Sequence, residues 1–323
     1  MSKPYRISGS RSAAILGISP YKTIQEVWME ILEEEKPGFC KLMGYELPTP
    51  PEGSQLEWGS GFESEIIDYV SKNNHLIITD REKSFINHDI CSCHVDGIVK
   101  HPHGDDENLE NKTTSIYYFK DNFGEAGTDK VPINYQSQNQ HNMICTENKS
   151  TLMPVLIFPK RTQEFENDEI FLDSIDKTLW VAALAEMGNL KYYKIDENKK
   201  TQEIMLDKYF DFWKVNIQGE KRPDPVSVDD IKLIFREPIG TVIATEQVER
   251  WHDEISQCNS EIKELKKRAE QLKKLNLEYL LEKSLKKEYV IDDDSQEKII
   301  MLDGCGKKIH SYYADKNGKL CFR

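Results

Sequence analysis

Three residues in the segment "HVDGIVKHPHGDDENLENKTT", residues 94–114, have the types and the spacing of a hydrolytic site that uses a metal ion. Asp96 lies between residues that favour β-strands, and Glu110 and Lys112 flank the single residue Asn111. Side chains two residues apart on a strand share a face. Glu110 and Lys112 can therefore both meet an aspartate that comes from a neighbouring strand.

Such a set of groups suits the hydrolysis of a phosphodiester with a divalent cation. Two carboxylates bind a hard cation such as Mg²⁺ or Mn²⁺ through oxygen, and the backbone carbonyl of Asn111 can supply a further ligand. A bound cation lowers the pKa of a water molecule and offsets charge on the phosphate, while the Lys112 ammonium orients that water or helps to deprotonate it. An Asp followed by Glu-x-Lys also occurs among ordinary surface charges, so the surrounding elements must decide.

Length and composition predict one main domain and a smaller appendage. The chain has 323 residues, of which 38% are hydrophobic, enough for one large core and a second small unit. We assign residues 1–235 to the main domain and 240–323 to the appendage, because two prolines in "RPDPVSVDD" mark a boundary. No apolar run approaches the ~20 residues that span a bilayer, and the first residues lack the apolar core of a signal peptide. We therefore expect a cytoplasmic protein with no membrane partner.

Charge and cysteine content restrict the partners further. The formal net charge of −13 argues against a nucleic-acid partner, because phosphate binding uses lysine and arginine, but a basic groove can coexist with an acidic exterior. The seven cysteines are scattered without a CxxC pair, so neither a disulfide framework nor a zinc site is expected. Cys91 and Cys93 would share one face of a strand, and we expect them to be buried free thiols.

Hydrophobic periodicity predicts an α+β fold. A period of three to four residues predicts helices over residues 10–16, 23–35, 57–73, 131–147 and 201–217. A period of two predicts strand segments over residues 75–87, 89–100 and 107–119. The stretch 36–56 is rich in proline and glycine and is expected to be a loop, whereas 149–177 follows neither period. The acidic residues 105–107 fall in a predicted turn, where we expect solvated side chains.

The residues after 240 predict an arm made of a long helix and a β-hairpin. Apolar residues alternate three and four apart as in a heptad repeat, at Val248, Trp251, Ile255, Cys258, Ile262, Leu265, Ala269 and Leu272. Short strands follow around Gly304, Gly306 and "DKNG". The repeat extends over only about three and a half heptads, so this stripe can pack against the main domain or bind a partner.

Five segments together resemble a known family. "ISGSRSAAILGISPY", "WGSGFE", "CHVDGI", "LENKTT" and "YQSQNQHNM" have the order and spacing of the YqaJ-type viral recombinase family, which is similar to phage lambda exonuclease and belongs to the PD-(D/E)xK nucleases. The resemblance covers residues 5–145 and continues more weakly to 235. It implies a restriction-endonuclease-like α/β/α core, with a central mixed β-sheet flanked by helices and the C-terminal arm as an addition.

The resemblance also implies metal-binding and catalytic residues. Asp96, Glu110 and the Asn111 carbonyl would bind Mg²⁺ or Mn²⁺, and Lys112 would be the catalytic lysine. Glu63 matches an acidic residue on the preceding helix that supports the metal. It lies beside the apolar stripe of that helix, so a surface charge is the alternative for Glu63.

Further residues match family positions near the DNA. Gln138 would form a hydrogen bond near the nucleophile or the scissile phosphate. Tyr135 and Gln140 belong to the same Y-x-x-Q-x-Q helix and are candidates for DNA contact, although Tyr135 can equally be a core residue. Ser10 matches a serine near the DNA end. Arg6 and Arg11 are candidates for binding the 5′-phosphate, since a helix N-terminus beside a hydroxyl and a guanidinium suits a phosphate.

The sequence departs from the family pattern at two positions, and one element depends on analogy. Val95 stands where the family usually has proline, and Arg11 stands where it often has aspartate; neither change removes a metal ligand. For "LWVAALAEMGNLKYYKI", propensity favours a helix followed by a strand. The family analogy favours a β-hairpin that turns at Gly188 and Asn189, and on that analogy we predict the hairpin.

The activity implied by the resemblance is magnesium-dependent digestion of linear double-stranded DNA from the 5′ end. This reaction leaves a 3′ single strand for a single-strand annealing protein. Better-known relatives form ring-shaped oligomers, so a homo-oligomeric ring such as a trimer is expected, with basic residues facing the channel. Two alternatives remain open: an endonuclease with the same catalytic residues, and a non-catalytic scaffold that binds DNA ends.

Overall fold

The computed structural model describes residues 6–44, 55–159, 176–226, 228, 230–231, 243–285, 298–302, 308–314 and 320–322. The chain divides into two compact units, Met1–Pro238 and Ile239–Arg323. The limit between the two units lies between the predicted segments 1–235 and 240–323.

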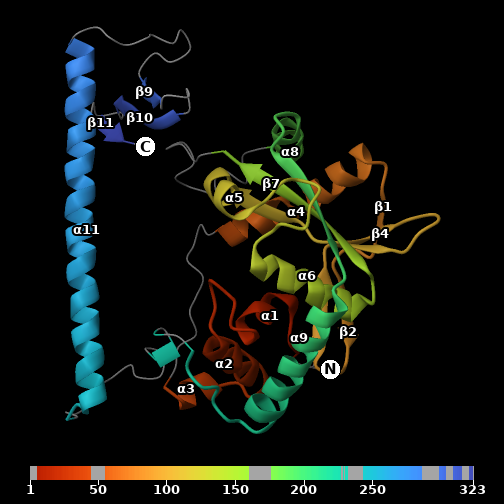
Figure 1. Cartoon of the computed structure of the whole chain (residues 1–323). Helices are drawn as coiled ribbons and strands as arrows, with labels where there is room; N and C mark the ends of the chain where they lie inside the picture. Colours follow the sequence, from red (N-terminus) through yellow and green to blue (C-terminus); the bar gives the residue numbers. More distant parts are fainter. Residues whose placement is uncertain are drawn as a thin grey trace. The chain divides into compact units, whose positions relative to one another are not determined.

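The first unit is built on a mixed six-stranded sheet whose central strand is β7 (Figure 1). Its strands are β1 (Ile77–Thr79), β4 (Gly97–Lys100), β5 (Glu107–Leu109), β6 (Lys112–Ser115), β7 (Ser150–Phe158) and β8 (Leu190–Asp196). The sheet runs in the order β1-β4-β5-β7, with antiparallel β1-β4 and β4-β5 pairs. Strand β7 is parallel to β5 and β6 and antiparallel to β8.

Strands β5 and β6 follow each other along one edge of β7. Asn108 of β5 pairs with Thr151, and Lys112 of β6 pairs with Val155 farther along β7. Glu110 and Asn111 therefore lie at a break between two short strands that share one partner. This break places the predicted Glu-x-Lys pair at the centre of the sheet.

A second, two-stranded sheet leads into the main sheet at Asp96. Strand β2 (Lys83–Asn87) pairs antiparallel with β3 (Cys91–Val95), and β4 begins at Gly97 directly after Asp96. On β3, Cys91, Cys93 and Val95 are buried, while the alternate residues are more exposed. The prediction that Cys91 and Cys93 are buried free thiols on one face is confirmed.

Helices lie on both faces of the main sheet. The helices of the first unit are α1 (Gly9–Ile15), α2 (Ile24–Glu35), α3 (Phe39–Leu42), α4 (Gln55–Asn73), α5 (Ile116–Asn122), α6 (Ile133–Thr146), α8 (Lys177–Glu186) and α9 (Lys199–Phe212), which continues as the π-helix η2 (Trp213–Gln218). Phe62 of α4 and Val181 of α8 pack with Leu156 on one face of β7. Met143 of α6 packs with Val155 on the other face. The predicted α+β fold, a central mixed sheet flanked by helices, is confirmed.

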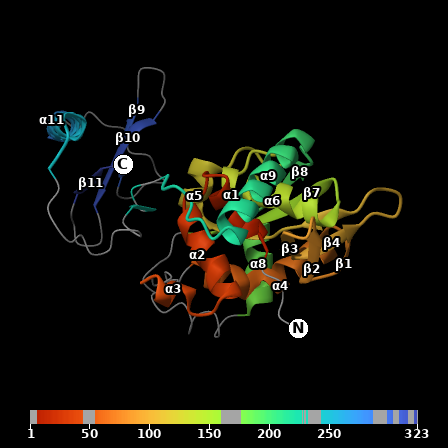
Figure 2. The ribbon, with the colours of Figure 1, turned by 90° about the horizontal axis from the view of Figure 1, so that it is seen from below.

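A third apolar cluster joins the N-terminal helices to β3 and α9. The ribbons of α1 and α9 lie side by side in Figure 2. Trp28 and Ile31 of α2, Cys91 of β3 and Tyr209 of α9 are members of this cluster. Helix α2 begins with a capping box, in which the Thr23 side chain accepts from the Glu26 backbone N–H and the Glu26 side chain accepts from that of Thr23. The predicted helices 10–16 and 23–35 are confirmed with small shifts at their ends.

The predicted hairpin at Gly188 and Asn189 is wrong. Residues 177–186 form helix α8, and β8 follows at Leu190. The Asp176 side chain caps the helix by accepting from the Leu179 N–H, and Gly188 follows the helix with a φ of 75°. Helix propensity therefore predicts this segment correctly, whereas the family analogy does not.

Three smaller expectations also change. Residues 116–119 begin helix α5 rather than extend a strand, because the Ser115 side chain caps a helix by accepting from the Tyr118 N–H. Helix α3 interrupts the predicted loop 36–56, of which residues 45–54 lie outside the described residues. Glu107 is a buried residue of β5, where it contacts Ser150 and Lys194, and is not a solvated turn residue.

The second unit contains a long helix and a small sheet. Helix α11 (Glu246–Leu285) carries the predicted heptad residues, and all eight of them are exposed. Strands β9 (Lys298–Leu302), β10 (Lys308–Ala314) and β11 (Leu320–Phe322) form an antiparallel sheet, so the predicted hairpin gains a third strand. Gly304, Gly306 and "DKNG" lie outside the described residues. None of the described helices has the length and apolar content to span a membrane.

We expect the Phe62→Ala substitution to destabilise the first unit by about 3–5 kcal/mol, because it leaves a cavity in the core. Phe62 is fully buried, and its ring lies 5.2 Å from the ring of Phe158. Urea unfolding followed by circular dichroism measures the change. Leu179→Ala on α8 is the control, since Leu179 is 67% exposed. Equal unfolding midpoints for the two variants would contradict this core assignment.

Candidate active site

Asp96 binds the backbone at the break between β5 and β6. Its Oδ2 accepts a hydrogen bond of 2.6 Å from the Asn111 backbone N–H. The Glu110 N–H, one residue earlier, still donates to the Leu152 carbonyl of β7 at 3.1 Å. The carboxylate thus takes the place of a strand partner, and the two residues between β5 and β6 are fixed against the junction of β3 and β4.

Glu110 is a buried carboxylate surrounded by N–H donors. Its side chain is 4% exposed. Oε1 accepts from Lys112 Nζ at 2.6 Å and from Gln138 Nε2 at 2.7 Å, and Oε2 accepts from Asn142 Nδ2 at 2.8 Å. Burial of a carboxylate without such partners is strongly unfavourable. These three donors therefore both permit the burial of Glu110 and fix its orientation.

Lys112 lies between the acidic residues and an aromatic ring. Its Nζ is 5.2 Å from the centroid of the Tyr135 ring. Burial lowers the pKa of Lys112, but the charges of Glu110 and Asp96 raise it, and the net pKa lies above its usual value. Lys112 is therefore an ammonium at neutral pH, held beside two carboxylates.

The two carboxylates share an environment that disfavours charge on both. Burial raises the pKa of Asp96 to about 7, the Lys112 charge opposes this rise, and the neighbouring Glu63 adds to it. Burial likewise raises the pKa of Glu110 to about 7, with Lys112 opposing and Asp96 adding to the rise. The single positive charge of Lys112 is thus not enough to keep both Asp96 and Glu110 fully ionised at neutral pH.

The donor set suits a hard divalent cation. Asp96, Glu110 and the Asn111 carbonyl could supply oxygen ligands, and Glu63 lies close enough to Asp96 to raise its pKa. Within the described residues, no three His, Cys, Asp or Glu side chains form a group that could hold a metal ion by themselves. The polar atoms of the buried Asn111 side chain also have no hydrogen-bond partner among those residues. A cation here would therefore need backbone oxygen and water besides the two carboxylates.

Comparison with known proteins gives one family match and a set of similar solved structures. The family model described as the YqaJ-like viral recombinase domain matches residues 2–149. These residues are similar to that family's domain, and we refer to them as the YqaJ-like domain. The matched segment contains Asp96, Glu110 and Lys112, together with Gln138 of α6. No curated protein matches the chain.

Two solved structures are similar to the chain over about two thirds of its length. One is an alkaline exonuclease from Laribacter hongkongensis, with 14% identity, a TM-score of 0.42 and coverage of 67% of this chain and 90% of that one. The other is a phage-related exonuclease from Haemophilus somnus 129PT, with 12% identity, a TM-score of 0.41 and coverage of 68% and 98%. At these TM-scores we transfer no residue role from either structure.

Helix α6 of the YqaJ-like domain brings only part of its predicted set to the site. Gln138 contacts Glu110, and Tyr135 faces Lys112. Gln140 is buried on another side of the helix, where Nε2 donates to the Asp196 carbonyl at 2.8 Å and Oε1 accepts from the Asn198 N–H at 2.9 Å. Gln140 thus joins α6 to the segment between β8 and α9, and its predicted DNA contact has no support from these bonds.

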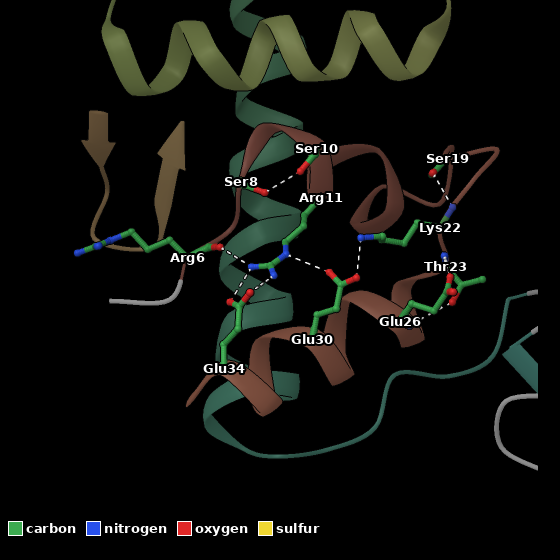
Figure 3. A network of polar contacts seen from close by, with 10 residues as sticks. All are labelled: Arg6, Ser8, Ser10, Arg11, Ser19, Lys22, Thr23, Glu26, Glu30 and Glu34. Carbon is green, nitrogen blue, oxygen red and sulfur yellow. Dashed lines mark hydrogen bonds and ion pairs between the residues drawn. The ribbon is translucent and has the colours of Figure 1, made fainter. Parts of the chain in front are cut away.

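Arg11 binds acidic residues of the YqaJ-like domain rather than facing solvent (Figure 3). Its Nε donates to Glu30 at 3.3 Å, and Nη1 donates to the Arg6 carbonyl at 3.2 Å and to Glu34 at 3.1 Å. Its Nη2 also donates to Glu34. Ser10 forms a 3.0 Å hydrogen bond with Ser8. Arg11 therefore joins α1 to α2. Its role in binding the 5′-phosphate stays a prediction, and these contacts do not support it.

Asn142 belongs to the site but was not among the predicted residues. It lies four residues after Gln138, which places both amides on the same face of α6. That spacing is the only signal in the sequence, and it becomes informative once Gln138 is known to face Glu110. Arg6, a predicted phosphate-binding residue, donates through Nε to the Asp89 carbonyl at 2.6 Å.

We expect Asp96→Asn to stabilise the metal-free protein more at pH 8 than at pH 5, with no gain below about pH 4. The pKa of Asp96 rises from 3.8 in the unfolded chain to about 7 in the folded protein, so the parent loses stability as the pH rises from about 4 to about 7, and the loss is complete above that range. Asparagine keeps the acceptor for the Asn111 N–H but does not ionise. Thermal unfolding in EDTA at both pH values measures the difference in Tm between variant and parent.

The control for this experiment is Asp68→Asn. Asp68 is an exposed residue of α4 whose Oδ1 lies 2.7 Å from Arg81 Nη1. Its effect on Tm should be small at both pH values. A Tm for Asp96→Asn that stays at or below that of the parent at pH 8 would show that burial of this charge costs the folded protein nothing.

Proposed function

We propose that the chain is a metal-dependent exonuclease of phage-type recombination that hydrolyses linear double-stranded DNA from the 5′ end and leaves a 3′ single strand. The observation that carries this proposal is the convergence of Asp96, Glu110 and Lys112 on one point of the sheet, with Gln138 bonded to the same carboxylate. The YqaJ-like domain supports a role in recombination. Asp96, Glu110 and Glu63 together carry more negative charge than Lys112 can balance, and this supports a role for a divalent cation.

The residues of the site have distinct tasks in this reaction. Asp96, Glu110 and the Asn111 carbonyl would hold Mg²⁺ or Mn²⁺, with Glu63 in support; the bound ion would lower the pKa of a water molecule and offset phosphate charge. The Lys112 ammonium, fixed by Glu110, orients the attacking water and stabilises the charge that develops on the phosphate. The tasks follow from chemical type: oxygen ligands for the cation, an N–H donor for the anion.

Gln138 has one further hydrogen-bond donor for the substrate. Its Nε2 carries two hydrogens, and one of them is used by Glu110. The other can donate to a phosphate oxygen beside Lys112. The Tyr135 ring faces the Lys112 ammonium and helps to keep it at the site. Gln138 thus orients both the Glu110 carboxylate and the DNA backbone.

The position of α1 supports the binding of a DNA end near this site. Helix α1 packs against α6, the helix that carries Gln138, and a 3.1 Å hydrogen bond joins Ser12 to Ser137. Ser10 on the exposed side of α1 and Arg6 just before it are the residues that we assign to the 5′-phosphate. Capture of a 5′-phosphate at α1 would give the enzyme its polarity.

We extend the proposal to the assembly and its partner. A homo-oligomeric ring, such as a trimer, would let basic residues line a channel for double-stranded DNA while the chain keeps a net charge of −13. A single-strand annealing protein would receive the 3′ strand. The apolar stripe of α11 supports a contact with another surface, either a partner protein or the first unit, because apolar patches often mark interfaces.

We expect purified protein to degrade end-labelled linear duplex only with Mg²⁺ or Mn²⁺, and Asp96→Asn, Glu110→Gln and Lys112→Met each to slow this reaction by about 10²–10⁴-fold. These variants keep side-chain size while removing the charge. Lys149→Ala is the control, because Lys149 is an exposed lysine paired with Asp105. Full activity in any of the three site variants would overturn the assignment. Nicking of closed circular DNA by the parent would favour the endonuclease alternative, and binding without cleavage would favour the scaffold.

We expect Ser10→Ala to reduce the preference for 5′-phosphorylated over 5′-hydroxyl ends toward equal rates. Single-turnover digestion of the two duplexes measures this ratio. Ser19→Ala, in the turn after α1, should leave the ratio unchanged. Arg11 variants are unsuitable here, because loss of the contacts with Glu30 and Glu34 would also loosen α1. Equal rates on both ends by the parent would count against a phosphate pocket at α1.

A further inference from the structure

Helix α1 approaches α6 at a position where only hydrogen fits. A Cβ atom at Gly9 would lie 2.7 Å from the Asn142 Oδ1 and 3.1 Å from the Gln138 Cγ. Gly9 is buried within a regular helix, so the missing side chain serves the close approach of the two helices and not an unusual backbone conformation. The two residues that it would meet are the amides of α6 that bind Glu110.

The Asn142 amide has little freedom to move aside. Its side chain is buried, the residue being 1% exposed, and Nδ2 donates to the Glu110 Oε2 at 2.8 Å. Rotation that withdraws Oδ1 from position 9 also withdraws Nδ2 from Glu110, because both atoms belong to one planar group. The planar Asn142 amide therefore contacts Gly9 through Oδ1 and Glu110 through Nδ2, and neither contact can change without the other.

Contacts on either side of Gly9 keep α1 in place. Ser12 donates to the Gly9 carbonyl at 2.7 Å and shares a 3.1 Å hydrogen bond with Ser137 of α6. On the other side of the helix, Arg11 is bound to Glu30 and Glu34 of α2 (Figure 3). The backbone at position 9 is thus held from two sides, so an added methyl group would displace the α6 side chains, Asn142 most of all because its Oδ1 is closest.

We propose that Asn142 is a positioning residue that orients the Glu110 carboxylate, and that Gly9 sets the amide in place by allowing α1 to pack directly against it. Lys112 and Gln138 both bind Oε1, so Asn142 is the described side chain that fixes Oε2. With one oxygen fixed by two donors and the other by one, the plane of the carboxylate is determined. The consequence for catalysis depends on the nuclease function proposed above, whereas the contact itself does not.

The first experiment measures the contact without DNA or metal. Thermal unfolding in EDTA compares the parent with Gly9→Ala, Asn142→Ala and the double variant. Gly9→Ala should lower Tm because its methyl group meets Asn142. The double variant should lose clearly less Tm than the sum of the two single losses, because the closer conflict, with Asn142 Oδ1, is gone and only the 3.1 Å approach to Gln138 Cγ remains. Additive losses in the double variant would overturn the proposal that Gly9 acts through Asn142.

The second experiment measures the effect on the reaction. Gly9→Ala and Asn142→Ala should each lower kcat about tenfold or more and leave KM for linear duplex within about twofold, because DNA contacts are kept. Asn142→Asp has the same size but lacks the N–H donor, so it should lower kcat at least as much as alanine. Full kcat with aspartate would show that volume, not the hydrogen bond, matters at this position.

Asn139→Ala is the matched control on the same helix. Asn139 is buried and donates to the Tyr135 carbonyl and to the Met153 sulfur, but it does not contact Glu110. It should lower Tm and leave kcat unchanged. A fall in kcat equal to that of Asn142→Ala would reduce the role of Asn142 to general stability. An inactive parent whose Gly9 and Asn142 variants show non-additive Tm values would instead refute the nuclease function and leave the contact standing.

Discussion

The burial of the Glu110 carboxylate is the constraint on which the arrangement of the site depends. A buried carboxylate is tolerated only with donors at both oxygens, and these come from a strand and from a helix that faces it. Lys112 lies two residues away on the same chain segment, whereas Gln138 and Asn142 come from α6. Helix α6 must therefore have one rotation about its axis and one distance from the sheet. The packing of α1 on α6 becomes part of the same requirement.

The interruption of two strands creates the room for this chemistry. The line of β5 and β6 breaks at Glu110 and Asn111, and the line of β3 and β4 breaks at Asp96. An uninterrupted strand would direct every N–H toward a neighbouring strand, but at the break the Asn111 N–H turns to the Asp96 carboxylate. The Asp96 carboxylate, which would bind a cation, thus also replaces the hydrogen bond that the Asn111 N–H lacks at the break.

The sequence predicted what depends on short spacing and missed what depends on distant packing. Glu110 and Lys112 share a strand face by their separation, so their convergence could be predicted. The hairpin at Gly188 failed because an analogy was preferred over strong local helix propensity. Glu107 lies in an acidic run and looks solvated, yet it is buried because partners from other strands satisfy it. Asn142 could not be singled out, because its contact with Glu110 depends on which face of α6 packs against the sheet.

The order of the strands along the chain has a consequence for how the site comes into being. The segment that matches the family ends at residue 149, and β7 begins at Ser150. Strands β5 and β6 do not pair with each other; both are held by β7, which in turn pairs with β8. During synthesis, Glu110 and Lys112 leave the ribosome well before the strand that aligns them. A nascent chain that ends at the family limit would carry every proposed catalytic side chain and still lack the template that brings them together.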